Sequence, residues 1–469
     1  MFLTEPRMNL APNGSAALSA IRPAFVWDCM KRISALVRRT HLTLVMFVIV
    51  VSAASTCARA QNIDIYFPPG ISGYDQQLGV TVLSRLRPLY AASGVRAGGF
   101  VLFPRADENV FYNSNLNGVA GSQSWGAETS AGLTAASDWS RDSLGAAIGI
   151  DHYQYFEFPG ESYTDFNVGA TGGYTIDDNQ LTLSYFHSTY HQLGTSVASV
   201  RTTTPIADQT DSARIYYTFQ FGRIALTPDF SVGVYRFGSA TLGGSQTSLS
   251  FLNRNVMAGG VTARYSMSDE GGLLLVVRGM ATDYVRPLPG QPSNNSDTGF
   301  ALTGIDYQSK SVWRYRLLVG IEVREFAASQ FQSRTAPIAE GSVIWQPTEL
   351  TTVTGSLSRL IEDPQSAGSN GYVLTQAQLT VDHELRRDMI LEARGGTQFV
   401  QFLQGGNQTN ITGGVSMDWL INRNMRLSIG YDITKQTSIS GNITGSTLAS
   451  TTTGQFNQQV AAVTLHFAL

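Results

Sequence analysis

The feature that most constrains this chain is a strict alternation of apolar and polar residues, repeated in about eighteen segments along its length. Residues 425–434 show it clearly, because odd-numbered positions carry Met, Leu, Ile, Tyr and Ile whereas even-numbered positions carry Arg, Ser, Gly, Asp and Thr. A strand turns successive side chains to opposite faces, so each segment has an apolar face and a polar face. The sequence therefore predicts an all-β protein, an antiparallel up-and-down transmembrane β-barrel of about eighteen strands.

The connections between the segments alternate between short and long. We place the strands at 98–112, 123–137, 142–158, 162–176, 180–192, 211–223, 224–239, 254–268, 271–286, 296–309, 312–327, 335–347, 350–362, 371–386, 388–403, 409–422, 424–438 and 456–469. Short turns are expected at 177–179, 227–229, 268–271, 386–388 and 422–424, and long connections at 194–211, 239–253, 287–297 and 441–454. Short turns belong on the periplasmic side and long loops outside the cell, so an even strand number returns both termini to the periplasm.

The first sixty residues have the composition of an export signal. Basic residues precede an apolar run at 42–51, and the small residues that follow it end in Ala58-Arg59-Ala60. We therefore expect residues 1–60 to be a signal peptide that is cleaved before Gln61. The apolar run is shorter than the ~20 residues of a membrane-spanning helix. Translation is expected to start at Met30, because nothing before that residue looks like a signal.

A lipid anchor on Cys57 is the alternative, but the residues before this cysteine lack the small Ala or Gly that a lipobox requires. Removing residues 1–60 removes both cysteines and leaves 25 Lys and Arg against 33 Asp and Glu, a net formal charge of −8. Disulfides and thiolate metal sites are thereby excluded from the mature chain. The acidic balance also argues against nucleic acid as a partner.

Two groups of residues, one near the mature start and one near the end of the chain, form ordered motifs. The first group comprises Arg85, Arg87, Pro88, Gly94, Arg96, Gly98, Phe100, Pro104, Asn109, Val110 and Phe111. The second is the hairpin 419–425. In order and layout these segments resemble the second β-barrel porin family of proteobacteria (β-barrel porin 2). The spacing from Pro104 to Asn109 is shorter than in that family, and the last residue is Leu469 instead of an aromatic residue, so Phe467 is expected to signal to the barrel-assembly machinery.

The resemblance implies a setting for the protein. Members of the family often accompany exopolysaccharide synthesis and export, and some are proposed as the outer-membrane exit for the polymer. The resemblance therefore implies the outer membrane of a Gram-negative cell as the location, with lipid and lipopolysaccharide around the barrel. A periplasmic polysaccharide export complex is an expected partner, and no cofactor or metal is expected.

The polar faces of the strands predict the lining of a channel. A barrel of about 16 to 18 strands is wide enough for water, and an arginine facing lipid at mid-membrane would cost about 2 to 4 kcal/mol. The residues predicted to line the channel are Arg264, Arg278, Arg314, Arg316, Glu322, Arg324, Gln376, Gln378, Asp382, Glu384, Glu392, Arg394, Gln398, Asp418, Arg426 and Asp432.

Two interpretations of this lining remain open. The side chains could form a polar track that binds sugar hydroxyls weakly and releases them, or they could simply pair with one another and hold the barrel round. A lining of mixed sign does not select strongly for small ions of one charge. Tyr216, Tyr235 and Phe186 are inward aromatics that could stack on sugar rings, although packing or interfacial roles are as plausible.

Residues 61–97 form a separate N-terminal piece with little periodicity. It could extend into the periplasm and meet an export complex, fold into the lumen as a plug, or remain a disordered leader.

Catalysis is not expected. His187 and His191 share a strand with Ser184 and Ser188, but no nucleophile elbow, HExxH motif or metal-spaced carboxylates accompany them. The mature chain contains three further histidines, His152, His383 and His466, for which an interfacial position is the simplest interpretation. The sequence thus predicts a channel for exopolysaccharide exit, with a general diffusion porin or a non-conducting polysaccharide-binding barrel as alternatives.

Overall fold

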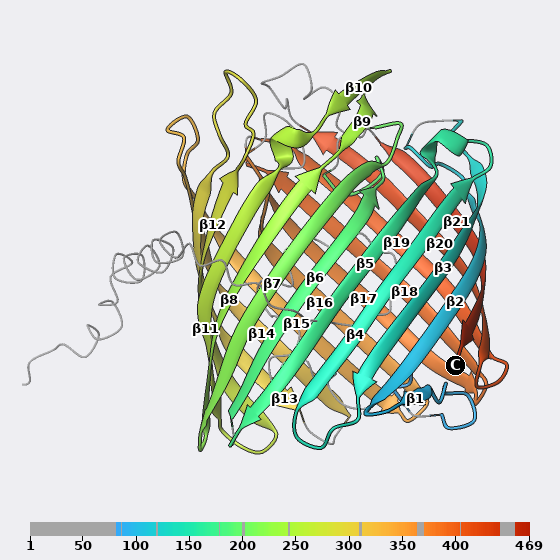
Figure 1. Ribbon diagram of the computed structural model, residues 1–469. Helices are drawn as coiled ribbons and strands as arrows, with labels where there is room; N and C mark the ends of the chain where they lie inside the picture. Colours follow the sequence, from blue (N-terminus) through green and yellow to red (C-terminus); the bar gives the residue numbers. More distant parts are fainter. Residues whose placement is uncertain are drawn as a thin grey trace, which may run out of the picture.

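A closed β-barrel accounts for nearly all of the structure, a computed structural model. It describes residues 81–85, 87–118, 121–177, 179–198, 202–242, 244–308, 312–363, 370–403, 405–440 and 455–469. Within these residues, 18 antiparallel strands form the barrel. The first long strand, β2 (Phe100–Asn113), pairs with both β3 (Ser124–Ser137) and the last strand, β21 (Phe456–Ala468), which closes the sheet (Figure 1).

All of the expected strands are present, which confirms the predicted fold. The others are β4 (Ser143–Tyr155), β5 (Tyr163–Ile176), β6 (Asn179–Gln192), β7 (Ile206–Phe221), β8 (Ile224–Phe237), β11 (Arg254–Ser266), β12 (Gly271–Tyr284), β13 (Ser296–Gln308), β14 (Trp313–Phe326), β15 (Arg334–Thr348), β16 (Thr351–Glu362), β17 (Tyr372–Arg386), β18 (Met389–Phe402), β19 (Asn407–Leu420) and β20 (Met425–Ser440). The expected signal peptide, with its cleavage site at Ala58, Ala60 and Gln61 and the start at Met30, lies outside the described residues.

Small elements were not anticipated from the sequence. β1 (Val95–Ala97) pairs with the start of β2. The long connection after β8 contains a hairpin of β9 (Ser239–Leu242) and β10 (Ser245–Ser248), followed by the 3-10 turn η2 (Ser250–Leu252). Another 3-10 turn, η1 (Pro159–Glu161), follows β4. Period-two patterning cannot detect these elements because none of them is longer than four residues.

One expected turn is wrong. Residues 227–229 lie inside β8, and the chain turns instead at Gly222, whose φ of 56° favours glycine. Pro228 pairs with Val261 on the β11 side, whereas the ladder to β7 is interrupted beside it. Proline has no N–H to donate, so the ladder loses a hydrogen bond at this position. The pairing of β8 with β11 continues past Pro228.

The two ends of the barrel differ. In Figure 1 the C terminus and β1 lie at the lower end with the short turns, and the β9–β10 hairpin lies at the upper end with the long connections. None of the helices in the described part of the chain is long and apolar enough to cross a membrane.

The outer surface of the barrel is apolar. On β14, Leu317, Val319 and Ile321 occupy alternate positions and are 43%, 62% and 47% exposed. Near the short-turn end, the rings of Trp313 and Trp345 stack with their centroids 5.3 Å apart. Exposed aliphatic side chains above a belt of aromatic rings are what a lipid-facing wall requires.

Candidate functional site

The strand register assigns the predicted lining residues to one face of the sheet. Pairs such as Gln376 with Gln398 and Asp382 with Glu392 lie directly opposite each other on neighbouring strands. When the register is followed around the barrel, every predicted lining residue falls on the face opposite to the exposed aliphatic side chains. That face is the inner one. The role of these residues in conduction stays a prediction.

Most of the inner arginines are neutralised by carboxylates. Arg264 binds Asp306 at 2.7 Å and Arg316 binds Glu340 at 3.2 Å. Further ion pairs on this face are Arg278–Asp229, Arg394–Glu392, Arg394–Asp432 at 2.6 Å and Arg426–Asp418 at 3.6 Å. Paired charges of opposite sign leave the wall polar without a strong field of either sign. Among these partners, Asp229, Asp306 and Glu340 were not in the predicted lining.

A second charge cluster spans the lumen near the long-loop end. Asp363, just after β16, receives Arg324 at 2.9 Å and Arg254 at 3.0 Å, although Arg254 belongs to distant β11. All three side chains are 5% exposed or less. Because β11 and β16 are separated by four strands of the wall, this contact narrows the channel from inside. Sequence reasoning missed it because Asp363 lies in a connection, where alternation carries no information.

Part of the inner face is apolar, which differs from the polar lining expected. Phe300, Leu302 and Leu318 are buried together with Tyr216 and with residues of β12, β15 and β16. They occupy the same alternating positions as the inner charges on their strands. The lumen therefore combines a buried apolar patch with paired charges, and Tyr216 packs in the patch.

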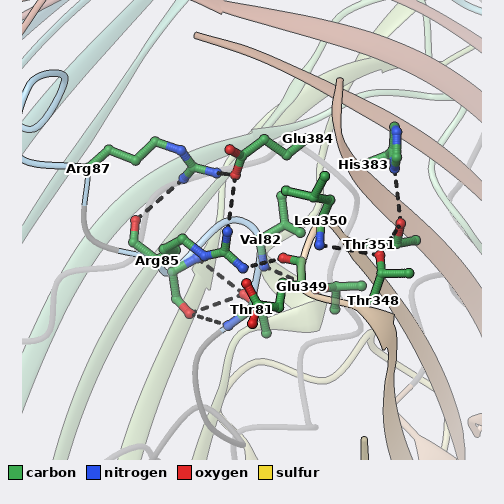
Figure 2. A network of polar contacts seen from close by, with 12 residues as sticks. Thr81, Val82, Arg85, Arg87, Thr348, Glu349, Leu350, Thr351, His383 and Glu384 are labelled. Carbon is green, nitrogen blue, oxygen red and sulfur yellow. Dashed lines mark hydrogen bonds and ion pairs between the residues drawn. The ribbon is translucent and has the colours of Figure 1, made fainter. Parts of the chain in front are cut away.

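The described part of the N-terminal piece contacts the short-turn end of the barrel on the side of β16 and β17. Figure 2 shows Arg85 and Arg87 converging on Glu384, with nitrogen–oxygen distances of 3.5 and 2.7 Å. Arg85 also donates to the backbone oxygen of Glu349, and the amide of Val82 donates to Thr352 Oγ1 at 3.0 Å. Arg85 and Arg87, which belong to the N-terminal motif, therefore contact Glu384, which belongs to the predicted lining.

From this contact the chain crosses the mouth of the barrel to reach β2. Strands β18 to β21 separate β17 from β2 in the closed sheet, so residues 88–94 bridge that distance. Gly94 and Gly98, with φ of 68° and 62°, flank β1 and permit its reversal onto β2. Arg96 binds Asp138 at 2.7 Å at an exposed position. Other motif residues lie in β2, where Pro104 and Phe100 face β3 in a regular ladder and Asn109 donates to Glu128.

A hydrogen-bonded chain crosses the seam where the first and last strands meet. His466 Nδ1 lies 2.8 Å from Asp107 Oδ1, and His466 Nε2 lies 3.0 Å from Ser428 Oγ. The order matches a hydrolytic triad, but the Ser428 hydroxyl also donates to Asp418. A serine that donates its proton to a carboxylate does not give it to the neighbouring histidine, so the histidine does not activate it as a nucleophile. These hydrogen bonds therefore tie β2, β21, β20 and β19 together.

The serine–histidine pair considered in the sequence is not assembled. Ser184 and His187 occupy positions of opposite parity on β6, so they face opposite sides of the wall. His187 instead contacts Asp211 at 2.8 Å on the outer face. In the described ranges no group of three or more His, Cys, Asp or Glu side chains could hold a metal ion.

A closed barrel with an aliphatic exterior and a polar and apolar interior is an outer-membrane β-barrel of the porin-like channel class. The model of the family described as "Putative beta-barrel porin 2" matches residues 87–453. The chain belongs to this family, and its location is the outer membrane. Among curated proteins, none matches the chain significantly.

The chain is also similar to solved structures of other proteins. Pseudomonas aeruginosa OccK1 (OpdK) is 10% identical, with a TM-score of 0.44, over 78% of this chain and 99% of its own. The FrpB iron transporter (F3-3 variant) of Neisseria meningitidis is 11% identical, with a TM-score of 0.42, over 71% of this chain and 62% of its own. Similarities this remote do not indicate which solutes pass through this barrel.

Proposed function

We propose that the barrel is the exit path for a secreted exopolysaccharide. The observation that carries the proposal is the charge pairing of the inner face, which leaves hydrogen-bonding groups without a strong net field. Amides contribute as well, since Gln408 Nε2 donates to Gln436 Oε1 at 2.9 Å and Gln398 donates to Gln376. Such a wall offers many weak hydrogen bonds to hydroxyl groups, and its apolar patch can pack against the C–H faces of sugar rings.

The proposal includes a periplasmic partner. The N-terminal segment lies at the mouth with the short turns, where a polysaccharide export complex would deliver the polymer. This segment would be the first part of the barrel that such a complex meets.

Labelling inside and outside the wall tests the export role. Residues 61–469 contain no cysteine, so one introduced cysteine accepts a bulky maleimide–polyethylene glycol specifically. Gln378→Cys places the label on the inner face, whereas the thiol of Leu379→Cys, its matched control, faces the lipid, where the water-soluble reagent does not reach it. The reagent should stop polymer secretion in cells with Gln378→Cys and leave secretion unchanged in cells with Leu379→Cys.

A deletion strain separates export from general diffusion. Loss of the gene should abolish secreted polymer while the uptake of small solutes stays normal. Normal secretion together with impaired uptake would assign the barrel to general diffusion. Normal secretion and normal uptake, together with loss of surface-bound polymer, would favour the non-conducting binding barrel.

A further inference from the structure

The wall of the barrel parts near its long-loop end, between β15 and β16. Backbone pairing of these strands ends at Ala339 and Arg359, although β15 begins at Arg334 and β16 continues to Glu362. On its other side, β15 stays paired with β14 up to Arg334. The two strands therefore separate locally while the rest of the wall remains closed.

Pro337 explains why the strands part at this position. Its carbonyl oxygen accepts a hydrogen bond from Arg359 Nε at 3.2 Å and so points toward β16. The amide position of a strand residue points to the same side as its carbonyl, but proline has no hydrogen to donate there. The ladder consequently loses a rung, and the Arg359 side chain occupies the space.

The separation opens a groove of about 850 Å³. Its apolar part includes Ile361, Val373 and Leu403, which pack against one another. Loop residues 330–332 and the exposed residues Thr335 and Pro337 complete its edge. The volume lies within the range of small-molecule sites, ~300–1,000 Å³.

Two arginines line the groove without a carboxylate partner among the described residues. Arg359 donates to Thr375 Oγ1, at 2.5 Å, and to Gln401 Oε1, at 3.3 Å, and Arg334 donates to the backbone oxygen of Leu403 at 2.5 Å. All of these acceptors are neutral. The arginines of the inner face described above are, by contrast, bound to carboxylates. Both groove guanidinium groups therefore retain a full positive charge for an anion.

The place of the groove identifies the anion. Arg359 and its partners Thr375 and Gln401 share the outward face of the wall with the lipid-facing residues, at the end with the long connections. In the outer membrane this is the level of the outer-leaflet headgroups. Arginine binds phosphate through short, charge-assisted hydrogen bonds, outer-leaflet headgroups carry phosphate, and the apolar floor next to the arginines suits an acyl chain.

We propose that this groove binds a phosphorylated glycolipid of the outer leaflet, the lipid A moiety of lipopolysaccharide. One phosphate lies between Arg334 and Arg359, and an acyl chain lies along Ile361 and Val373. The bound lipid closes the gap that Pro337 leaves in the wall. Arg359, Ile361 and Val373 belong to the outward face of the wall, so the proposal stands whether or not the channel exports polymer.

Lipid binding to the refolded barrel tests the proposal. The chain without its leader is refolded in detergent free of lipopolysaccharide, and bisphosphorylated lipid A is titrated with detection by native mass spectrometry. One lipid A should bind per barrel, and Arg334→Gln/Arg359→Gln should weaken its binding by about tenfold or more. Dephosphorylated lipid A should bind wild type and double variant equally weakly.

Matched controls keep the test decisive. Arg423→Gln removes an exposed charge from the turn at the other end of the barrel and should bind lipid A like the wild type. The single variant Arg359→Gln should also weaken binding, though less than the double variant, and it covers the case in which the double variant fails to refold; Arg359→Lys, which keeps the charge, should bind more tightly than Arg359→Gln. The heat-dependent mobility of each variant on gels establishes that it is folded.

Several results would overturn the assignment. These are unchanged binding by the folded double variant, weakened binding by Arg423→Gln, or equal affinity for dephosphorylated lipid A. Displacement of lipid A by millimolar inorganic phosphate would show a free-anion site instead, and equally tight binding of phosphatidylglycerol would show a general phospholipid site. Either outcome refutes a lipid A site.

Discussion

At the scale of single residues, the inner wall depends on charges that are buried and paired. Arg278 and Asp229 are 1% and 2% exposed, so the attraction between them offsets the cost of desolvating both groups. A buried ion pair adds little net stability, but removing one partner leaves an uncompensated charge. Exposed pairs lack this dependence because water solvates whichever group remains.

Arg278→Met should lower the free energy of unfolding by about 3 kcal/mol or more. Adding Asp229→Asn should recover part of the loss, because a neutral amide costs less to bury than an unpaired carboxylate. Urea unfolding in micelles measures both. Arg386→Met, in a pair whose arginine is 68% exposed, is the control and should change stability by about 1 kcal/mol at most. A double variant no more stable than Arg278→Met would refute the pairing argument.

Glu161, in η1 outside the membrane, should make stability depend on pH. Burial raises the pKa of its carboxyl above the ordinary value of 4.5, and the hydrogen bond from Asn117, at 2.8 Å, offsets this only in part. A raised pKa in the folded state means that stability is full below pH 4.5 and falls as pH rises through the folded pKa.

Glu161→Gln removes this cost while keeping an oxygen for Asn117. The thermal midpoint of the variant should therefore exceed that of the wild type at pH 8 and equal it at pH 4. The comparison is made by circular dichroism in micelles. An equal difference between the two proteins at both pH values would show that titration of Glu161 is not involved.

At the scale of elements, the N-terminal segment is held to the mouth by its two arginines. Glu384→Gln removes the shared carboxylate, so the bond after Arg85 should become accessible to trypsin, which does not cleave the Arg87–Pro88 bond. Cleavage there should accelerate by about tenfold, since cleavage follows the population of the released state. Mass spectrometry of timed digests measures the rate.

Glu349→Gln is the matched control for the released segment. The hydrogen bond from Arg85 to Glu349 goes to the backbone oxygen of Glu349, which the substitution leaves in place. Its digestion should match that of the wild type. Equal cleavage rates for Glu384→Gln and Glu349→Gln would mean that the ion pairs do not hold the segment.

The strands could be predicted from the sequence because each carries several repeats of the alternation, and the parity of the positions then grouped the predicted lining residues on one face. Turn residues alone were misleading at 227–229, where pairing with β11 extends the strand through Pro228. The partners of the lining charges could not be predicted, since contacts such as Arg254–Asp363 arise only after closure. The groove follows from Pro337, but a proline within a strand does not indicate which neighbour loses its pairing.

At the scale of the whole molecule, closure between β2 and β21 leaves no free edge and makes a continuous wall. A barrel of this strand number is wide enough for water unless side chains fill it. Here the apolar patch, the cluster around Asp363 and the N-terminal segment occupy parts of that width. The passage is therefore narrower than the strand number alone implies, which suits one polymer chain passing in extended form.

Single-channel current across a planar bilayer tests the central claim that the barrel is a water-filled passage for a sugar polymer. Purified wild-type protein should give stepwise ionic currents with weak ion selectivity, and neutral oligosaccharides added on one side should interrupt them briefly in proportion to their concentration. Folded protein that inserts into the bilayer but carries no current, or whose current oligosaccharides leave unaffected, would contradict the account.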